Sequence, residues 1–149
     1  MRHRKRTVKL GRTASHRKAM FRNMVTSLLA QERIETTVVK AKEASRLADK
    51  MVTLAKTGTL HARRRALSFI MDKETVGKLF SVLAARYANR DGGYTRIIRT
   101  GFRRGDGAEL ALVEMIGRIA PKPKTDEKKK KKAKTAEEPK PASEATGDK

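Results

Sequence analysis

Hydrophobic residues in the middle of the chain follow two periods, one typical of helices and one typical of strands. From Ser15, a candidate N-cap, to about Gln31, apolar residues recur every three or four positions and predict an amphipathic helix. Residues 33–38 are instead rich in β-branched side chains that alternate with polar ones, which predicts a short strand.

Helical spacing then returns three times. A helix over 44–55 is predicted to end at Gly58, and a shorter helix covers 62–70. Asp72 is placed to cap a third helix over 76–87, which a pair of glycines ends a few residues later.

Two further strands are predicted, from Tyr94 to Thr100 and from Ala108 to Ile116. Three glycines lie between them, which is typical of a turn. The order is therefore helix, strand, three helices and two strands. It predicts an α+β fold of two layers, in which helices cover a small three-stranded mixed sheet.

Composition divides the chain into three parts. Residues 1–14 form a basic arm with too few apolar side chains to fold alone, and residues 15–119 form the α+β domain. Residues 120–149 hold all four prolines, a run of five lysines and no aromatic residue. This composition predicts a disordered tail rich in Lys, Pro and Glu.

The net charge indicates the kind of partner that the protein binds. The chain has 37 Lys and Arg against 16 Asp and Glu, a formal net charge of +21. Such a domain repels itself in low salt, and nucleic acid is the polyanion that usually offsets this charge. An anionic membrane surface is the alternative, but the arm lacks the bulky apolar anchors that this binding favours. No apolar run is long enough to predict a membrane span.

The first 31 residues contain nine Lys or Arg and no acidic residue. Several of these cations lie where a helix is predicted to begin, although the helix dipole disfavours positive charge there. A phosphate would reverse this effect, because backbone N–H groups and basic side chains would converge on one anion. The residues of this block predicted to bind RNA are Arg2, His3, Arg4, Lys5, Arg6, Lys9, Arg12, Ser15, His16, Arg17, Lys18 and Arg22.

Two more basic groups lie further along the chain. Arg63 and Arg64, followed by Arg65, occupy the side of a predicted helix opposite its apolar residues, where a solvated face and RNA contact both remain open. The predicted hairpin carries four arginines among glycines that permit close approach to an RNA backbone. These hairpin residues are Arg96, Arg99, Arg103 and Arg104.

Aromatic residues are few and mostly fall on apolar helix stripes. Only Tyr94 and Phe102 are left as candidates to stack on unpaired bases. We therefore expect recognition through phosphate, sugar and shape, as for folded double-helical RNA. Composition alone leaves DNA open as the partner.

No pattern in the sequence predicts catalysis. The histidines His3, His16 and His61 lie in basic sequence with no carboxylate nearby to make a general base. The chain has no phosphate-binding glycine loop, no paired-histidine metal motif and no cysteine. The expectation is a protein that is not an enzyme and needs no metal, cofactor or small-molecule substrate.

Many short segments, in order and in register over about Met1 to Gly117, resemble the bacterial large-subunit ribosomal protein seventeen family. The clearest are Met1-Arg2-His3-Arg4, Ser15-His16-Arg17, Phe21-Arg22-Asn23, Lys40-Ala41-Lys42-Glu43, Gly92-Gly93-Tyr94-Thr95-Arg96-Ile97 and Gly101-Phe102-Arg103. The resemblance implies the same α+β fold and a structural, non-enzymatic component of the ribosome in the cytoplasm. It further implies contact with 23S ribosomal RNA and with neighbouring large-subunit proteins, near the mouth of the nascent-chain exit tunnel.

The alternative function is that of a free DNA- or RNA-binding regulator or nucleoid-type protein, which would use the same basic surface away from the ribosome. Co-sedimentation distinguishes the two, because a ribosomal protein stays with large subunits through a moderate-salt wash. The tail departs from the family's shared core, and the resemblance implies nothing about its role.

Deletion of residues 120–149 should leave folding and incorporation into ribosomal subunits unchanged. The segment has no residues that could form a core, and its ten lysines and six acidic residues leave a net charge of only +4. Thermal unfolding of the truncated protein and its recovery in purified subunits measure both effects. Loss of incorporation after this deletion would give the tail a role in assembly.

Overall fold

The computed structural model describes residues 8–118, so the candidate RNA-binding residues Arg2, His3, Arg4, Lys5 and Arg6 and the predicted tail lie outside the described residues. The chain begins with helix α1 (Ala14–Gln31), strand β1 (Arg33–Thr37) and helices α2 (Val38–Lys56) and α3 (Leu60–Phe69). A continuous helical segment follows, made of α4 (Lys73–Lys78), a π-helical stretch η1 (Leu79–Leu83) and α5 (Ala84–Arg86). Strands β2 (Thr95–Phe102) and β3 (Glu109–Met115) complete the predicted order of elements.

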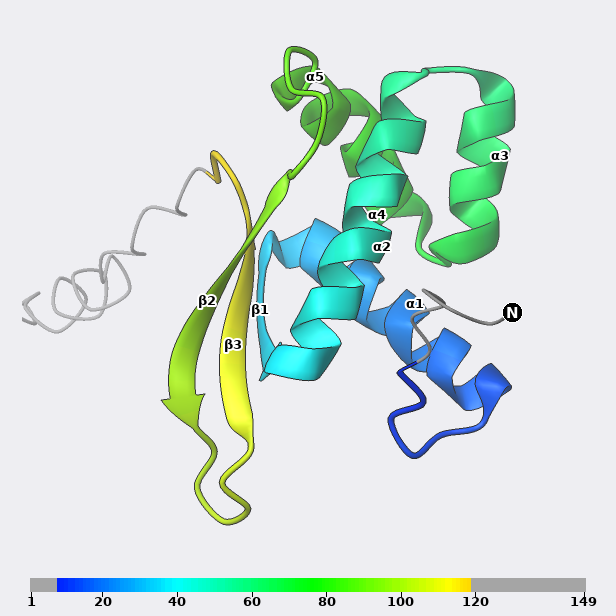
Figure 1. The fold of residues 1–149 in the computed structure, drawn as a ribbon. Helices are drawn as coiled ribbons and strands as arrows, with labels where there is room; N and C mark the ends of the chain where they lie inside the picture. The colour runs from blue at the N-terminus through cyan, green and yellow to red at the C-terminus, as the bar shows by residue number, and fades with distance from the viewer. Residues whose placement is uncertain (1–7, 119–149) are drawn as a thin grey trace, which may run out of the picture. The chain divides into compact units, whose positions relative to one another are not determined.

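The three strands form one sheet in the order β1-β3-β2, and both neighbouring pairs are antiparallel. The predicted α+β class is confirmed, whereas the expectation of a mixed sheet is wrong. The physical reason is the position of β3, which turns back from β2 and lies between β2 and β1. Strands β1 and β2 run in the same direction but never pair, because β3 separates them (Figure 1).

The helices cover one face of this sheet (Figure 1). Helix α2 packs against α1 and against all three strands, and its buried face consists largely of alanine. Small side chains let the neighbouring backbones approach closely, so the larger aliphatic residues of α1 and of the sheet fill the core. The buried alanines of α2 are Ala41, Ala44, Ala48 and Ala55.

The helix ends agree with the sequence at two of three predicted caps. Asp72 accepts hydrogen bonds from the backbone N–H groups of Glu74 and Thr75 and caps α4 as expected. Gly58 follows the end of α2 with a φ of +66°, a left-handed conformation that glycine adopts without strain. The N-cap of α1 is Thr13, so Ser15 lies inside the first turn and its predicted capping role is wrong.

Glu32 joins the end of α1 to two other elements. It adopts a left-handed conformation with φ +61°, its N–H donates to the carbonyl of Leu28 at 2.7 Å, and its carbonyl accepts from Met115 of β3 at 2.9 Å. Its carboxylate lies 2.6 Å from the Arg86 guanidinium and 2.8 Å from Lys78 Nζ. Burial opposes ionisation of this side chain, but hydrogen bonds from Arg86 and Lys78 outweigh it and hold the pKa of Glu32 below its ordinary value.

Replacing Glu32 by Gln should lower the free energy of unfolding by about 3 kcal/mol at neutral pH, since it leaves two partly buried cations without their counterion. Because the pKa of Glu32 is lowered in the folded state, its contribution is complete above its ordinary value of 4.5 and is lost as the pH falls through the folded value. Urea unfolding at several pH values measures this. The difference between wild type and Glu32→Gln should shrink in acid.

Glu109→Gln is the matched control, because that side chain is exposed on the hairpin and lies 3.9 Å from an exposed Arg99. It should change the free energy of unfolding by less than about 1 kcal/mol at any pH. An equal effect of the two substitutions would contradict the special role given to Glu32.

Candidate nucleic-acid interface

The segment just before α1 folds back against the first turn of that helix. Leu10 and Gly11 both have positive φ, and the Arg12 N–H donates to the carbonyl of Lys9 at 3.2 Å, which closes a tight turn. The Arg17 guanidinium donates to the carbonyls of Lys9 and Arg12 at 3.4 and 3.3 Å. This turn gathers four predicted RNA-binding residues: Lys9, Arg12, His16 and Arg17.

The first turn of α1 supplies N–H groups beside these cations. The Thr13 side chain caps no backbone N–H of this turn and instead lies 3.4 Å from Ser15 Oγ, and no acidic residue lies in the turn. Ser15, His16 and Lys18 are exposed here. A phosphate at this position would meet backbone N–H groups and positive side chains together, which is the chemistry expected from the sequence.

Arg22 differs from Arg12 and Arg17, whose guanidinium groups donate to carbonyls of the adjacent turn, because its own guanidinium donates to another helix. It donates from Nε to the carbonyl of Phe69 and from Nη2 to that of Ser68, both at 2.8 Å. These carbonyls lie at the C-terminal end of α3, where helix geometry leaves acceptors unpaired. The structure therefore places Arg22 as a link between α1 and α3.

The three arginines of α3 lie on its exposed side, opposite the buried residues Ala62 and Ala66. The Arg63 guanidinium carbon lies 5.1 Å from the centre of the Phe80 ring, within cation–π range. This contact orients Arg63 without neutralising its charge. Arg64 and Arg65 extend the same exposed basic face.

The β2–β3 hairpin carries the remaining predicted arginines, and three of them have acidic neighbours. Arg96 lies 3.6 Å from Glu114, and Arg99 lies 3.9 Å from Glu109. Exposed pairs at such distances are weak, so these arginines remain available to a stronger anion. Among the described residues, Arg104 at the tip is exposed and forms no ion pair.

A closer ion pair orders the hairpin tip. Arg103 donates to both carboxylate oxygens of Asp106, and these hydrogen bonds, together with one from the N–H of Ala108, lower the pKa of Asp106 to about 2. The N–H of Arg103 also donates to the carbonyl of Ala108 across the turn. Arg103 is therefore partly neutralised, while Phe102 beside it is 72% exposed.

Tyr94 was expected to be available for base stacking, and the structure corrects this. Its side chain is only 1% exposed, since β2 begins at Thr95 and Tyr94 lies in the core below the preceding loop. The ring packs 5.1 Å from that of Tyr87, with Lys56 Nζ 5.9 Å from its centre. Of the two candidates, only Phe102 is exposed.

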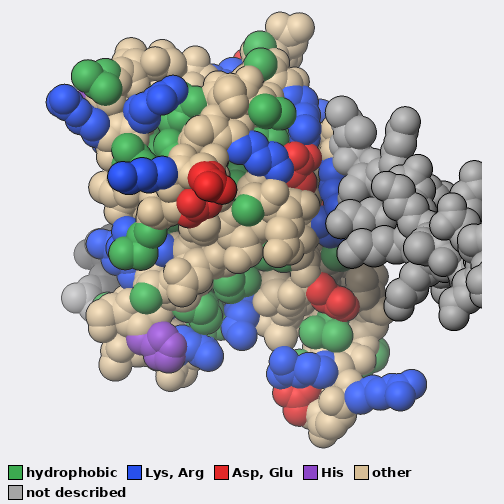
Figure 2. Space-filling view, turned by 180° about the vertical axis from the view of Figure 1, so that it is seen from behind, with side chains coloured by type: hydrophobic (Ala, Val, Ile, Leu, Met, Phe, Trp, Pro, Cys, Tyr) green, Lys and Arg blue, Asp and Glu red, His purple; other side chains and the backbone are tan. Residues whose placement is uncertain are grey.

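Basic side chains are scattered over the face of the molecule seen in Figure 2, from the helical end at the top to the hairpin at the bottom, and fewer acidic side chains lie among them.

The described residues 8–118 contain no cluster of three or more metal-binding side chains. Within the same range, no helix is long and apolar enough to cross a membrane.

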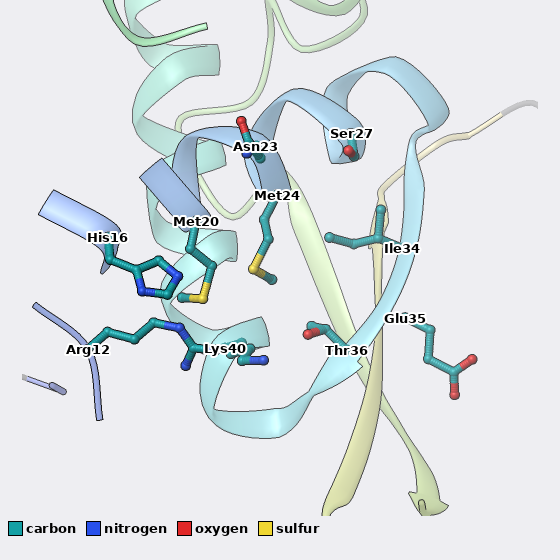
Figure 3. A pocket seen from close by; sticks show the side chains of 10 residues that line it. All are labelled: Arg12, His16, Met20, Asn23, Met24, Ser27, Ile34, Glu35, Thr36 and Lys40. Atoms are coloured by element: carbon teal, nitrogen blue, oxygen red, sulfur yellow. The ribbon is translucent and has the colours of Figure 1, made fainter. Parts of the chain in front are cut away.

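Sequence reasoning missed a groove beside α1. It lies between α1, β1 and the start of α2, and Figure 3 shows Met20 and Met24 on one side of it and Ile34 and Thr36 on the other. Lys40 joins the basic residues here although it lies outside the predicted set. The only sequence signal is the spacing of His16, Met20 and Met24, which places all three on one side of α1. The remaining lining residues are Arg12, Asn23, Ser27, Ile34, Glu35 and Thr36.

The fold and this surface define a small basic α+β protein whose exposed cations are spread over several elements. Residues 20–116 match the family model described as Ribosomal protein L17, and the chain belongs to that family. This is a family of structural proteins of the ribosome, and its members are not enzymes.

Similar proteins support the same assignment. The chain is 57% identical over 136 residues to the "Large ribosomal subunit protein bL17" of Geobacter metallireducens, covering 91% of this chain and 75% of the relative. It is 60% identical over 117 residues to the protein of that name from Desulfotalea psychrophila, and this match covers 78% of this chain and 91% of the relative. It is 56% identical over 108 residues to the protein of that name from Moorella thermoacetica, and this match covers 72% of this chain and 96% of the relative.

Replacing Arg22 by Met should lower the free energy of unfolding by about 2 kcal/mol, because two carbonyls at the end of α3 lose a charged donor. Lys18→Met, one turn earlier on the same helix and exposed, should change it by less than about 0.5 kcal/mol. Denaturant unfolding of both variants measures the difference. Equal stability of the two would show that the Arg22 contacts do not hold α3 in place.

Proposed function

We propose that this chain is a structural constituent of the bacterial large ribosomal subunit that binds and stabilises folded 23S ribosomal RNA through its phosphates. Family membership and relatives named as large-subunit proteins support a structural role in the ribosome, and hence in the cytoplasm. The proposal that the partner is 23S RNA and that its phosphates are bound is supported by the distribution of cations on the protein surface.

The observation that carries the proposal is the distribution of cations across separate elements. The turn before α1, the exposed side of α3 and the hairpin each present basic side chains. On the hairpin, Asp106 pairs closely with Arg103, and the acidic partners of Arg96 and Arg99 lie at 3.6 and 3.9 Å. A surface that is positive at several separate places fits a large folded polyanion better than a compact ligand. The scarcity of exposed aromatic rings favours phosphate and shape over base stacking as the main mode.

The RNA-binding residues that we propose fall into four groups. The first is the N-terminal arm, with Arg2, His3, Arg4, Lys5 and Arg6. The second is the turn and the beginning of α1, with Lys9, Arg12, Ser15, His16, Arg17 and Lys18. The third is α3, with Arg63 and Arg64, and the fourth is the hairpin, with Arg96, Arg99, Arg103 and Arg104. Arg22 is omitted, because two of its guanidinium nitrogens each donate at 2.8 Å to a carbonyl at the end of α3.

The resemblance of the sequence to its family supports a position near the mouth of the nascent-chain exit tunnel, beside other large-subunit proteins. Co-sedimentation with large subunits through a moderate-salt wash tests the ribosomal assignment. A chain that washes off and binds duplex DNA equally well would be a free nucleic-acid-binding regulator.

Affinity for protein-free large-subunit RNA should fall steeply with salt. For about 6–10 phosphate contacts, the loss between about 50 and 200 mM salt is about 10³–10⁵-fold. Filter binding or anisotropy at several salt concentrations gives the slope of log affinity against log salt. A nearly flat slope would exclude phosphate contacts as the main source of affinity.

Single substitutions test which residues make the phosphate contacts. Arg64→Gln and Arg104→Gln should each reduce the magnitude of the slope by about 1, because each removes one phosphate contact. Lys50→Gln, an equally exposed cation on α2 outside the proposed surface, should leave the slope unchanged. If Lys50→Gln changes the slope as much as the other two, the attraction depends on total charge rather than on these sites.

A further inference from the structure

The groove beside α1 has the dimensions of a small-ligand site. Its volume is about 410 Å³, within the range of about 300–1,000 Å³ usual for pockets that hold small molecules. Residues from three elements and from the turn before α1 line it, and Figure 3 shows the side chains of α1 facing those of β1 across it. The groove therefore lies at the edge of the folded core, and helices and strands supply most of its lining.

The floor of the groove is apolar. Met20 and Met24 of α1 and Ile34 of β1 are partly buried, and Ile34 also packs against the hydrophobic core. Thioether groups are polarisable and make favourable contacts with aromatic rings. Two adjacent methionines thus offer a surface on which a flat ring can lie.

The rim of the groove is basic. Arg12, His16 and Lys40 lie around it, and in Figure 3 the side chains of Arg12 and His16 are close to one another at one end. The one acidic lining residue, Glu35, points away from the groove and accepts a hydrogen bond from Thr100 Oγ1 at 3.1 Å. The electrostatic balance of the groove therefore favours an anion.

Hydrogen-bonding groups complete the lining. Asn23, Ser27 and Thr36 place amide and hydroxyl groups beside the methionines. In the described chain, Arg12 Nε is buried and has no hydrogen-bond acceptor, while its Nη1 donates to the carbonyl of Leu10 at 3.0 Å. A buried guanidinium N–H without an acceptor is costly, and a nearby anion would offset that cost.

We propose that the groove receives a single unstacked nucleotide of the RNA, with the base against Met20 and Met24 and its phosphate held by Arg12, His16 and Lys40. A nucleotide combines a flat apolar ring, polar edges and one negative charge, which are the three features that the groove accommodates. Bases in loops and bulges of folded RNA are free to enter such sites, whereas bases within a helix are not. The inference rests on the proposed RNA-binding function and adds one site at which a base is bound.

The test uses the full-length protein and protein-free large-subunit RNA. Ser27→Phe fills the groove from an exposed position of α1 without changing charge. It blocks the space for the base but leaves Arg12, His16 and Lys40 at the rim to hold the phosphate. RNA binding should therefore weaken by about tenfold or more, while the salt slope stays unchanged. Lys40→Gln should weaken binding and reduce the slope by about 1.

Ser81→Phe is the matched control, since Ser81 is also an exposed helical serine but lies in η1, away from the groove. It should bind RNA like the wild type, and thermal unfolding should show that both phenylalanine variants fold. If Ser27→Phe binds RNA normally, the groove holds no nucleotide. If it binds RNA normally but is incorporated poorly into subunits, the occupant is a neighbouring protein and the proposal is wrong. Failure of the wild-type protein to bind RNA would instead overturn the proposed function itself.

Discussion

The ionised Glu32 side chain is the constraint on which the arrangement of the layers depends. Three elements meet at this residue. Its backbone ends α1, and its carbonyl accepts a hydrogen bond from Met115 of β3. Its carboxylate pairs with Lys78 of α4 and Arg86 of α5. Lys78 also donates to the carbonyl of Ala30, so the same cation covers the end of α1. Because charge-assisted hydrogen bonds are directional, the carboxylate sets both the distance and the orientation of the elements that it joins.

Sequence patterns predicted the elements well because most of them are defined by local periodicity. The buried positions of α1 and α2 and the cap at Asp72 follow from spacing and side-chain chemistry within a few residues. The order of strands does not, since pairing between β1 and β3 joins residues that lie far apart in the chain. The same limit explains Tyr94, whose burial depends on Tyr87 and on the core rather than on its strand-like neighbours.

Charge along the sequence was enough to predict which segments form the basic surface. The sequence identifies the basic turn, α3 and the hairpin, but it cannot separate Arg22 from its neighbours. The acceptors of Arg22 lie on another helix, more than forty positions away. The groove could not be predicted either, because its floor and rim come together only when α1, β1 and α2 pack. The contacts of Arg22 and the shape of the groove both depend on tertiary structure, which local sequence patterns do not determine.

The central place of β3 has a consequence for how the protein is made. Synthesis runs from the N-terminus, so β1 is finished long before the strand that pairs with it. Until Glu109–Met115 has left the ribosome, β1 has an unpaired edge on both sides and β2 has none of its backbone partners in the sheet. Helices α1 and α2 have local hydrogen bonds and can form earlier, but the sheet closes only at the end. A newly made copy therefore reaches its RNA-binding shape after translation of nearly the whole domain, and not progressively during it.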